Sequence, residues 1–278
     1  MNEALKNLEQ GMAGRELDAL LVTDPKHVYY LTGFASNPHE RFLGLLLVRG
    51  EEPVLIVPAL DAEAAQAASS VTTILTHSDT DNPYNLLKEQ LSHTSLGKLG
   101  IEKEHFSVAR YELLTASVPV KQIDDIGPLL RSMRAKKTPD EVQRMKHAAE
   151  LVEEVLRRGL EHVKAGVSEI ELVAELEYLM KKVGASGPSF DTMVLSGPNT
   201  ALPHGVPGSR IIQPGDFIMF DLGVYAAGYA SDITRTFAVE EADSKLVNIY
   251  NTVLAANEAG IAASTTGGTL GSVDRAAR

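Results

Sequence analysis

Short apolar runs alternate with helical patterns along the first half of the chain. An amphipathic helix is predicted over residues 2–13, where Leu5, Leu8 and Met12 fall on one face. Strands are predicted at residues 18–22, 42–48, 54–57, 71–75, 99–101 and 118–123, and helices at residues 61–68, 83–91 and 105–116. This alternation predicts an α/β domain with a mixed sheet and flanking helices, which we place at residues 1–131.

Helices begin again after a basic stretch at residues 131–137, with strong start signals. Thr138 and Glu141 form one capping box, and Ser168 and Glu171 form a second, so each pair begins a helix. The pattern then predicts a strand at 190–195, a Gly- and Pro-rich loop at 196–210, two strands within 217–239, and helices from 242 and 267. The order helix, helix, strand and hairpin is thus followed by two more helices, so the same order begins to repeat. We place this second domain at residues 132–278.

The predicted hairpin carries two aspartates. A two-residue loop of Ala226 and Ala227 would place Asp221 directly opposite Asp232, with Cβ atoms roughly 4.5–5.5 Å apart. Carboxylates at that separation repel, so we expect the pair to share a proton or a cation. A bulge at Gly228 would shift the register by one residue and leave the two carboxylates as neighbours.

Composition and charge narrow the possible partners. The chain has 278 residues, a net charge of −11 and 44% hydrophobic residues, which is typical of a globular protein and argues against nucleic acid or an anionic membrane surface. No apolar run approaches the roughly 20 residues that span a bilayer. The absence of cysteine is compatible with a reducing cytoplasm, where we place the protein. Any metal must therefore be bound by oxygen and imidazole nitrogen.

Two separate motifs resemble the pita-bread metallopeptidases, the family of aminopeptidase P, prolidase and creatinase. They are Asp221-Leu222-Gly223 with Tyr229 to Thr236, and Leu202-Pro203-His204-Gly205. The stretches 30–34 and 38–42 resemble the bacterial Xaa-Pro peptidase branch. The resemblance covers the whole chain and implies a creatinase-type N-terminal domain followed by an α+β pita-bread domain.

The resemblance also implies a site. It would make Asp221 a bidentate ligand of one divalent metal ion and Asp232 the ligand that bridges two. His204 would hydrogen-bond the substrate or the tetrahedral intermediate, and Thr234 would place a hydroxyl beside the ligands. The metals expected are manganese or cobalt, with zinc or iron as alternatives. The activity expected is hydrolysis of peptides with proline at the second position by metal-activated water.

The sequence departs from this family in one respect. The family also uses a histidine and two glutamates further along, and nothing in this chain matches them. We therefore expect the pita-bread domain to be incomplete and the chain truncated, with exposed apolar faces that favour a homodimer. The alternative is a non-catalytic, metal-poor relative that acts as a dimerising or scaffold protein. A metal-free creatinase-like hydrolase is a third possibility, against which Asp221 and Asp232 argue.

The other histidines show no metal-ligand spacing. His27, His77, His93, His105, His147 and His162 are predicted to be surface or packing residues. His147, Glu150 and Glu154 share one helix face, which could bind a metal, but a solvated face with helix ion pairs is more common. His39 belongs to a cluster with Glu40 and Arg41 that either forms surface ion pairs or reaches a neighbouring subunit.

Overall fold

The computed structural model describes residues 2–278 and divides the chain into two compact units. The first unit ends at Lys137 and the second begins at Thr138. The boundary predicted from the sequence, after residue 131, falls inside helix α6 (Gly127–Ala135), whose Leu130 is buried in the first unit's core. None of the described helices combines the length and the apolar composition that a membrane span requires.

The first unit is built on a six-stranded mixed sheet in the order β4-β3-β2-β1-β5-β6. Its strands are β1 (Ala19–Val22), β2 (Gly44–Val48), β3 (Val54–Pro58), β4 (Thr73–His77), β5 (Lys98–Ile101) and β6 (Gln122–Asp125). Besides α6, its helices are α1 (Glu3–Gly14), α2 (Pro25–Thr32), α3 (Ala62–Ala68), α4 (Pro83–Gln90) and α5 (Val108–Ser117). The pairs β1–β2 and β2–β3 are antiparallel, and the other three pairs are parallel.

Both faces of the central strands of this sheet are buried. Alternate residues point to opposite faces of a strand, so Leu20 of β1 joins one core and its neighbour Leu21 joins another. The first core lies against α1, α2 and α6, and the second lies against α4 and α5. This double covering explains why β1 to β3 are continuously apolar rather than alternating.

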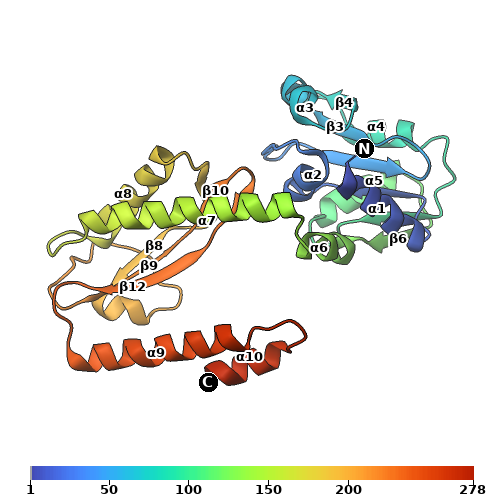
Figure 1. Cartoon of the computed structure of the whole chain (residues 1–278). Coiled ribbons are helices and arrows are strands. Elements are labelled where there is room, and N and C mark those ends of the chain that lie inside the picture. The colour runs from blue at the N-terminus through green and yellow to red at the C-terminus, as the bar shows by residue number, and fades with distance from the viewer. Residues whose placement is uncertain (1) are drawn as a thin grey trace. The chain divides into compact units, whose positions relative to one another are not determined.

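The second unit combines helices with two small antiparallel sheets (Figure 1). Its helices are α7 (Pro139–Gly159), α8 (Glu169–Lys182), α9 (Ser244–Ala263) and α10 (Leu270–Ala277). Strands β8 (Met193–Ser196), β9 (Phe217–Leu222) and β12 (Ile233–Ala238) form one sheet in the order β12-β9-β8. Strands β7 (Gly187–Pro188), β10 (Val224–Ala226) and β11 (Tyr229–Ala230) form the other, in the order β11-β10-β7. Both predicted capping boxes form, and they begin α7 and α8.

The larger sheet of this unit has its core on one face. Ile218, Phe220 and Leu222 of β9 are buried against α7 and α8, whereas Met219 and Asp221 between them are half-buried on the opposite face. We call this opposite face the open face. At one end of it, the Phe217 ring meets Tyr250 of α9 edge to face, with centroids 6.1 Å apart.

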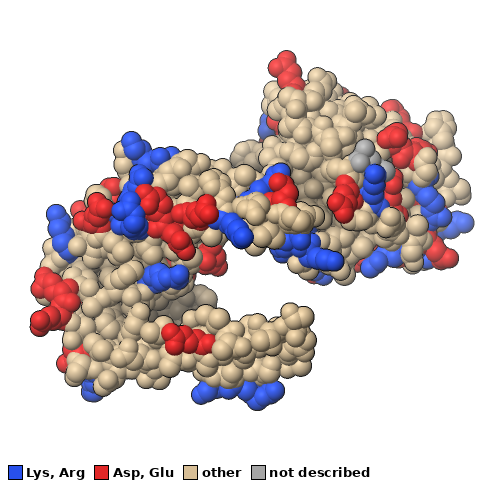
Figure 2. Space-filling view, viewed as in Figure 1, with Lys and Arg blue, Asp and Glu red and all other residues tan. Residues whose placement is uncertain are grey.

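Helix α9 leaves much of its own apolar surface uncovered. Large exposed hydrophobic residues on α9 and α10 are Val247, Ile249, Tyr250, Val253, Leu254, Ile261 and Leu270. In Figure 2 the helix pair carries few charged side chains on the face in view. The expectation of exposed apolar helix faces is confirmed for these residues.

Two helices of the first unit are missing from the sequence prediction. Helix α2 lies in a stretch for which the sequence pattern predicts no helix, and α6 ends within the basic stretch at residues 131–137 that precedes the next predicted helix. Both begin with a proline in the first turn, a common helix start. In α6 the arginines at the surface obscured the apolar side, on which Leu130 is buried.

Candidate metal site

The hairpin turn sets the register of the two aspartates. Its loop is Ala227-Gly228, with φ angles of +48° and +78°, and Ala226 pairs with Tyr229 across it. Two-residue hairpin loops of this kind need positive φ at both positions, which Gly228 adopts without strain. The predicted loop of Ala226 and Ala227 is therefore wrong. Ala226 stays in the strand, and the register moves accordingly.

Asp221 consequently faces Thr234 rather than Asp232. The Thr234 hydroxyl donates a hydrogen bond to Asp221 Oδ1 over 3.0 Å, and Met193 of β8 pairs with Asp221 on its other side. The Asp221 side chain is half-buried and lies on the open face. A carboxylate oxygen that accepts one hydrogen bond retains a lone pair for a cation.

Asp232 lies diagonally across from Asp221. It directly precedes Ile233, which packs against the core, so strand alternation places Asp232 on the same face as Thr234. Diagonal neighbours in an antiparallel pair are roughly 7–8 Å apart at Cα, close enough for two carboxylates to converge on one cation. The two aspartates are neighbours on one face, although they are not directly opposed.

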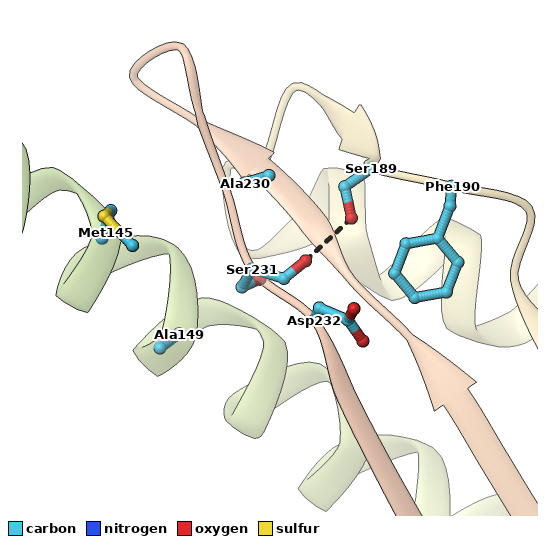
Figure 3. Close-up of a pocket in the computed structure, with 7 residues that line it drawn as sticks. All are labelled: Met145, Ala149, Ser189, Phe190, Ala230, Ser231 and Asp232. Atoms are coloured by element: carbon cyan, nitrogen blue, oxygen red, sulfur yellow. Dashed lines mark hydrogen bonds between the residues drawn. The ribbon is translucent and has the colours of Figure 1, made fainter. Parts of the chain in front are cut away.

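A pocket of about 420 Å³ adjoins Asp232. It is lined by Met145, Ala149, Ser189, Phe190, Ala230, Ser231 and Asp232. Figure 3 shows the Asp232 carboxylate on the Phe190 side of this pocket, away from the α7 residues. An exposed carboxylate therefore borders a largely apolar cavity.

Only glycine fits at position 223, directly after Asp221 and Leu222. A Cβ atom at this position would overlap the Ser231 carbonyl oxygen and the Ser189 hydroxyl, which themselves hydrogen-bond over 2.8 Å. The Ser231 N–H donates to the Val224 carbonyl over 2.9 Å. The segments that carry Ser189 and Ser231 therefore lie close against Gly223. This contact fixes the position of Asp232, which directly follows Ser231.

The loop that carries His204 lies on the same open face. Leu195 pairs with Met219, so its side chain is on that face, and the loop residue Gly205 approaches Leu195 so closely that an added Cβ would be 2.6 Å from it. His204 itself is exposed. Within residues 2–278 no hydrogen bond or ion pair links it to either aspartate, so convergence of the three side chains stays a prediction.

The two aspartates provide only part of a metal-binding donor set. Two carboxylates suit a hard divalent cation whose remaining ligands are water or substrate. Across residues 2–278, however, the only three acidic or histidine side chains within 4.8 Å of one another are Asp24, His27 and Glu102 of the first unit. Asp221 and Asp232 therefore do not form a group of three this tight with any other carboxylate or imidazole of the described chain.

The cluster around His27 is a hydrogen-bonded network. Arg134 can only donate, so its Nη1, 2.9 Å from His27 Nε2, leaves the imidazole Nδ1–H to donate to Glu102. Both ring nitrogens are occupied in this way, and Glu102 Oε2 accepts from the Thr23 and Asp24 N–H groups over 2.6 and 3.0 Å. Of the two predicted alternatives, surface or packing, His27 is a packing residue, and its partners are too distant in sequence for spacing to reveal them.

Comparisons with known proteins were made with the whole chain. Residues 5–136 match the creatinase/prolidase N-terminal domain, and residues 143–278 match metallopeptidase family M24. A putative dipeptidase of Bacillus subtilis is 38% identical over 94% of this chain and 72% of its own length. An uncharacterized peptidase of Staphylococcus aureus is 37% identical over 95% of this chain and 74% of its own.

Solved structures give the same result. The Xaa-Pro dipeptidase from Bacillus anthracis aligns with a TM-score of 0.85 and 31% identity, over 93% of this chain and 71% of that one. The prolidase from Pyrococcus horikoshii aligns with a TM-score of 0.88 and 31% identity, over 99% of this chain and 76% of that one. The predicted fold, a creatinase-type domain followed by part of a pita-bread domain, is confirmed.

Proposed function

Because this chain belongs to metallopeptidase family M24 and carries a creatinase/prolidase N-terminal domain, we propose that it is a metal-dependent exopeptidase for Xaa-Pro bonds. Its substrates would be short peptides with proline at the second position, of the aminopeptidase P or Xaa-Pro dipeptidase type. The names of the Bacillus anthracis and Pyrococcus horikoshii relatives support this substrate class.

The observation that carries the proposal is the shared face of Asp221 and Asp232. Asp221 and Asp232 would hold one or two divalent cations, which in this family supply an activated water and polarise the scissile carbonyl. The Thr234 hydroxyl restrains Asp221 by donating to its Oδ1 over 3.0 Å, so that carboxylate is oriented before any cation arrives. His204, exposed on its loop over the open face, would donate a hydrogen bond to the substrate oxygen.

Metal binding tests this proposal most directly. Calorimetric titration with Mn²⁺ or Co²⁺ should show saturable binding to the wild-type chain, and Asp221→Asn and Asp232→Asn should each weaken it roughly tenfold or more. Glu240→Gln is the matched control, since it removes an exposed carboxylate just beyond β12 and should leave the affinity unchanged. Equal metal stoichiometry and affinity in all four proteins would refute the assignment of the two aspartates.

The second candidate is a non-catalytic, metal-poor protein that functions as a homodimer. The lack of a three-ligand cluster that includes the aspartates in residues 2–278 favours it, as do the exposed apolar residues of α9. Light scattering with the metal titration separates the two. Dimers that bind no metal and hydrolyse no proline-containing dipeptide at millimolar Mn²⁺ support the scaffold, whereas metal-dependent hydrolysis supports the peptidase.

A further inference from the structure

A third carboxylate of the second unit, outside the candidate site, is completely buried and makes no ion pair in the described chain. Glu169 is the first residue of α8, with 0% of its surface exposed. In the described part of the chain no lysine, arginine or histidine lies within ion-pair distance of it. Its charge is instead surrounded by N–H and O–H groups, so the carboxylate is held by hydrogen bonds alone.

These donors come from the two ends of one loop. Ser196, where the loop begins, donates its N–H over 2.7 Å and its hydroxyl over 3.0 Å to Oε1 of Glu169. The Asn199 amide lies 3.0 and 3.2 Å from the two carboxylate oxygens. Gly208, near the end of the loop, donates its N–H to Oε2 over 3.2 Å. The segment enclosed by these contacts, residues 197–207, carries His204.

Backbone and side-chain contacts close the same loop a second time. The N–H groups of Glu169 and Ile170 donate to the Arg210 and Gly208 carbonyls, each over 3.1 Å. Arg210 reaches across to the Ser196 hydroxyl over 3.1 Å while it pairs with Asp216 over 2.9 Å. The loop is therefore closed at its base around the Glu169 side chain.

The chemistry of this position requires a carboxylate. Burying a charge without an opposite charge is costly unless several hydrogen bonds replace the lost water, and five donor contacts do so here. An ionised carboxylate only accepts, which matches surroundings made only of donors. A glutamine of the same shape would direct its NH₂ group at the Ser196 or Gly208 N–H, and one contact would become a clash between donors.

We propose that Glu169 is the positioning residue of the His204 loop. By joining Ser196 and Asn199 to Gly208, it holds the loop over Leu195 on the open face, the face that carries Asp221. The role of His204 toward substrate rests on the proposed peptidase function, whereas the fixing of the loop does not. Glu169 itself touches neither the aspartates nor the pocket beside Asp232.

Glu169→Gln tests the proposal when hydrogen exchange is measured by NMR on the full chain. We expect the Ser196 and Gly208 amides to exchange roughly tenfold faster or more, while amides of β9 and β12 keep their protection. The His204 imidazole resonance, identified by its loss in His204→Gln, should shift and sharpen as the loop becomes mobile. Unchanged exchange at Ser196 and Gly208, or equal acceleration throughout the second unit, would overturn the proposal.

Three further variants provide controls. Glu171→Gln, two residues along α8 in the capping box, removes a carboxylate that holds only Ser168 and should leave the loop amides and the His204 resonance unchanged. Glu169→Asp keeps an acceptor-only group and should restore part of the protection. If Glu169→Gln does not fold, Asn199→Ala removes one donor and leaves the carboxylate in place. It should loosen the loop less but at the same amides, and an unchanged loop in that variant contradicts the proposal.

A metal titration separates this inference from the proposed function. Glu169→Gln leaves both aspartates unaltered, so it should bind Mn²⁺ as the wild type does. If the wild type binds no Mn²⁺, the peptidase proposal fails, and the exchange result still decides whether Glu169 fixes the loop. If Mn²⁺ binds but the loop amides do not respond to Glu169→Gln, the peptidase proposal stands and the positioning role is refuted.

Discussion

The two units use their main sheets in different ways. In the first unit helices cover both faces, and consecutive residues of β1 enter separate cores. In the second unit one face of the β8–β9–β12 sheet forms the core, while the other face carries Asp221 and Thr234. A sheet face that is not part of the continuous core can carry polar side chains in a fixed register at lower cost, which suits the candidate site in the second unit.

Each unit also buries one glutamate, and the two differ in their partners. Glu102 accepts from two backbone N–H groups and from His27, whose ring is held in turn by Arg134. This chain ties the start of α2 to the last turn of α6, so Glu102 connects elements of the core. Glu169 has no charged partner among the described residues and connects the two ends of a surface loop. The first arrangement links elements of a domain core, and the second closes the loop that carries His204.

The largest predicted loss of unfolding free energy comes from truncating neighbouring core residues of one strand. Leu20→Ala and Leu21→Ala should each destabilise the first unit by roughly 2–5 kcal/mol, because each leaves a cavity in a different core. Phe220→Ala should cost the second unit about 3–5 kcal/mol, whereas Met219→Ala, on the open face, should cost about 1 kcal/mol. Hydrogen exchange in increasing urea, followed by mass spectrometry, reports the two units separately.

The Met219 variant is the critical member of this set. If Met219→Ala lowers the unfolding free energy as much as Phe220→Ala does, the open face is covered in solution. In a homodimer that uses this face, the cost would also depend on protein concentration. A small cost that is independent of concentration would place the open face in solvent and leave it accessible to substrate.

A smaller effect is expected at the hairpin turn. Ala227 has a φ of +48°, a conformation that disfavours any residue with a Cβ, so Ala227→Gly should stabilise the second unit by roughly 0.5–1 kcal/mol. Ala226 is a buried strand residue, and Ala226→Gly should destabilise by a similar amount. Thermal unfolding of both variants measures the difference. The opposite order of stability would support the register in which Asp221 faces Asp232 directly.

This turn also shows where sequence reasoning was insufficient. The hairpin, both capping boxes and the motif residues could be recognised, because each depends on residues close together in the chain. The register could not be derived, because Ala226 and Ala227 have the same side chain and the choice between them depends on backbone conformation and sheet pairing. A shift of one residue in the loop moved the partner of Asp221 by two positions, from Asp232 to Thr234.

Contacts between distant residues were the other gap. His27 meets Glu102 across 75 positions of sequence, and Glu169 meets Gly208 across 39. Neither glutamate belongs to a sequence pattern that indicates burial. Glu169, for example, is an acidic residue in the first turn of a helix, where acidic residues are common at the surface. Such residues become recognisable only when tertiary structure shows which donors surround them.

The smallest predicted effect concerns a glutamate that has charged partners but remains accessible to water. Hydrogen bonds from Arg157 and Arg158 lower the pKa of Glu154 on α7 from its ordinary value of 4.5 to about 2. Because the pKa is lower in the folded protein, the stabilisation is complete above about pH 4.5 and is lost as the pH falls through about 2. The melting temperature of Glu154→Gln should therefore lie slightly below that of the wild type at neutral pH, and the two should converge toward pH 2. Added salt should reduce the difference, since solvent reaches Glu154 and both of its arginine partners. A difference that persisted unchanged at pH 2 would instead mean that Glu154 stabilises α7 through packing, as a buried side chain does.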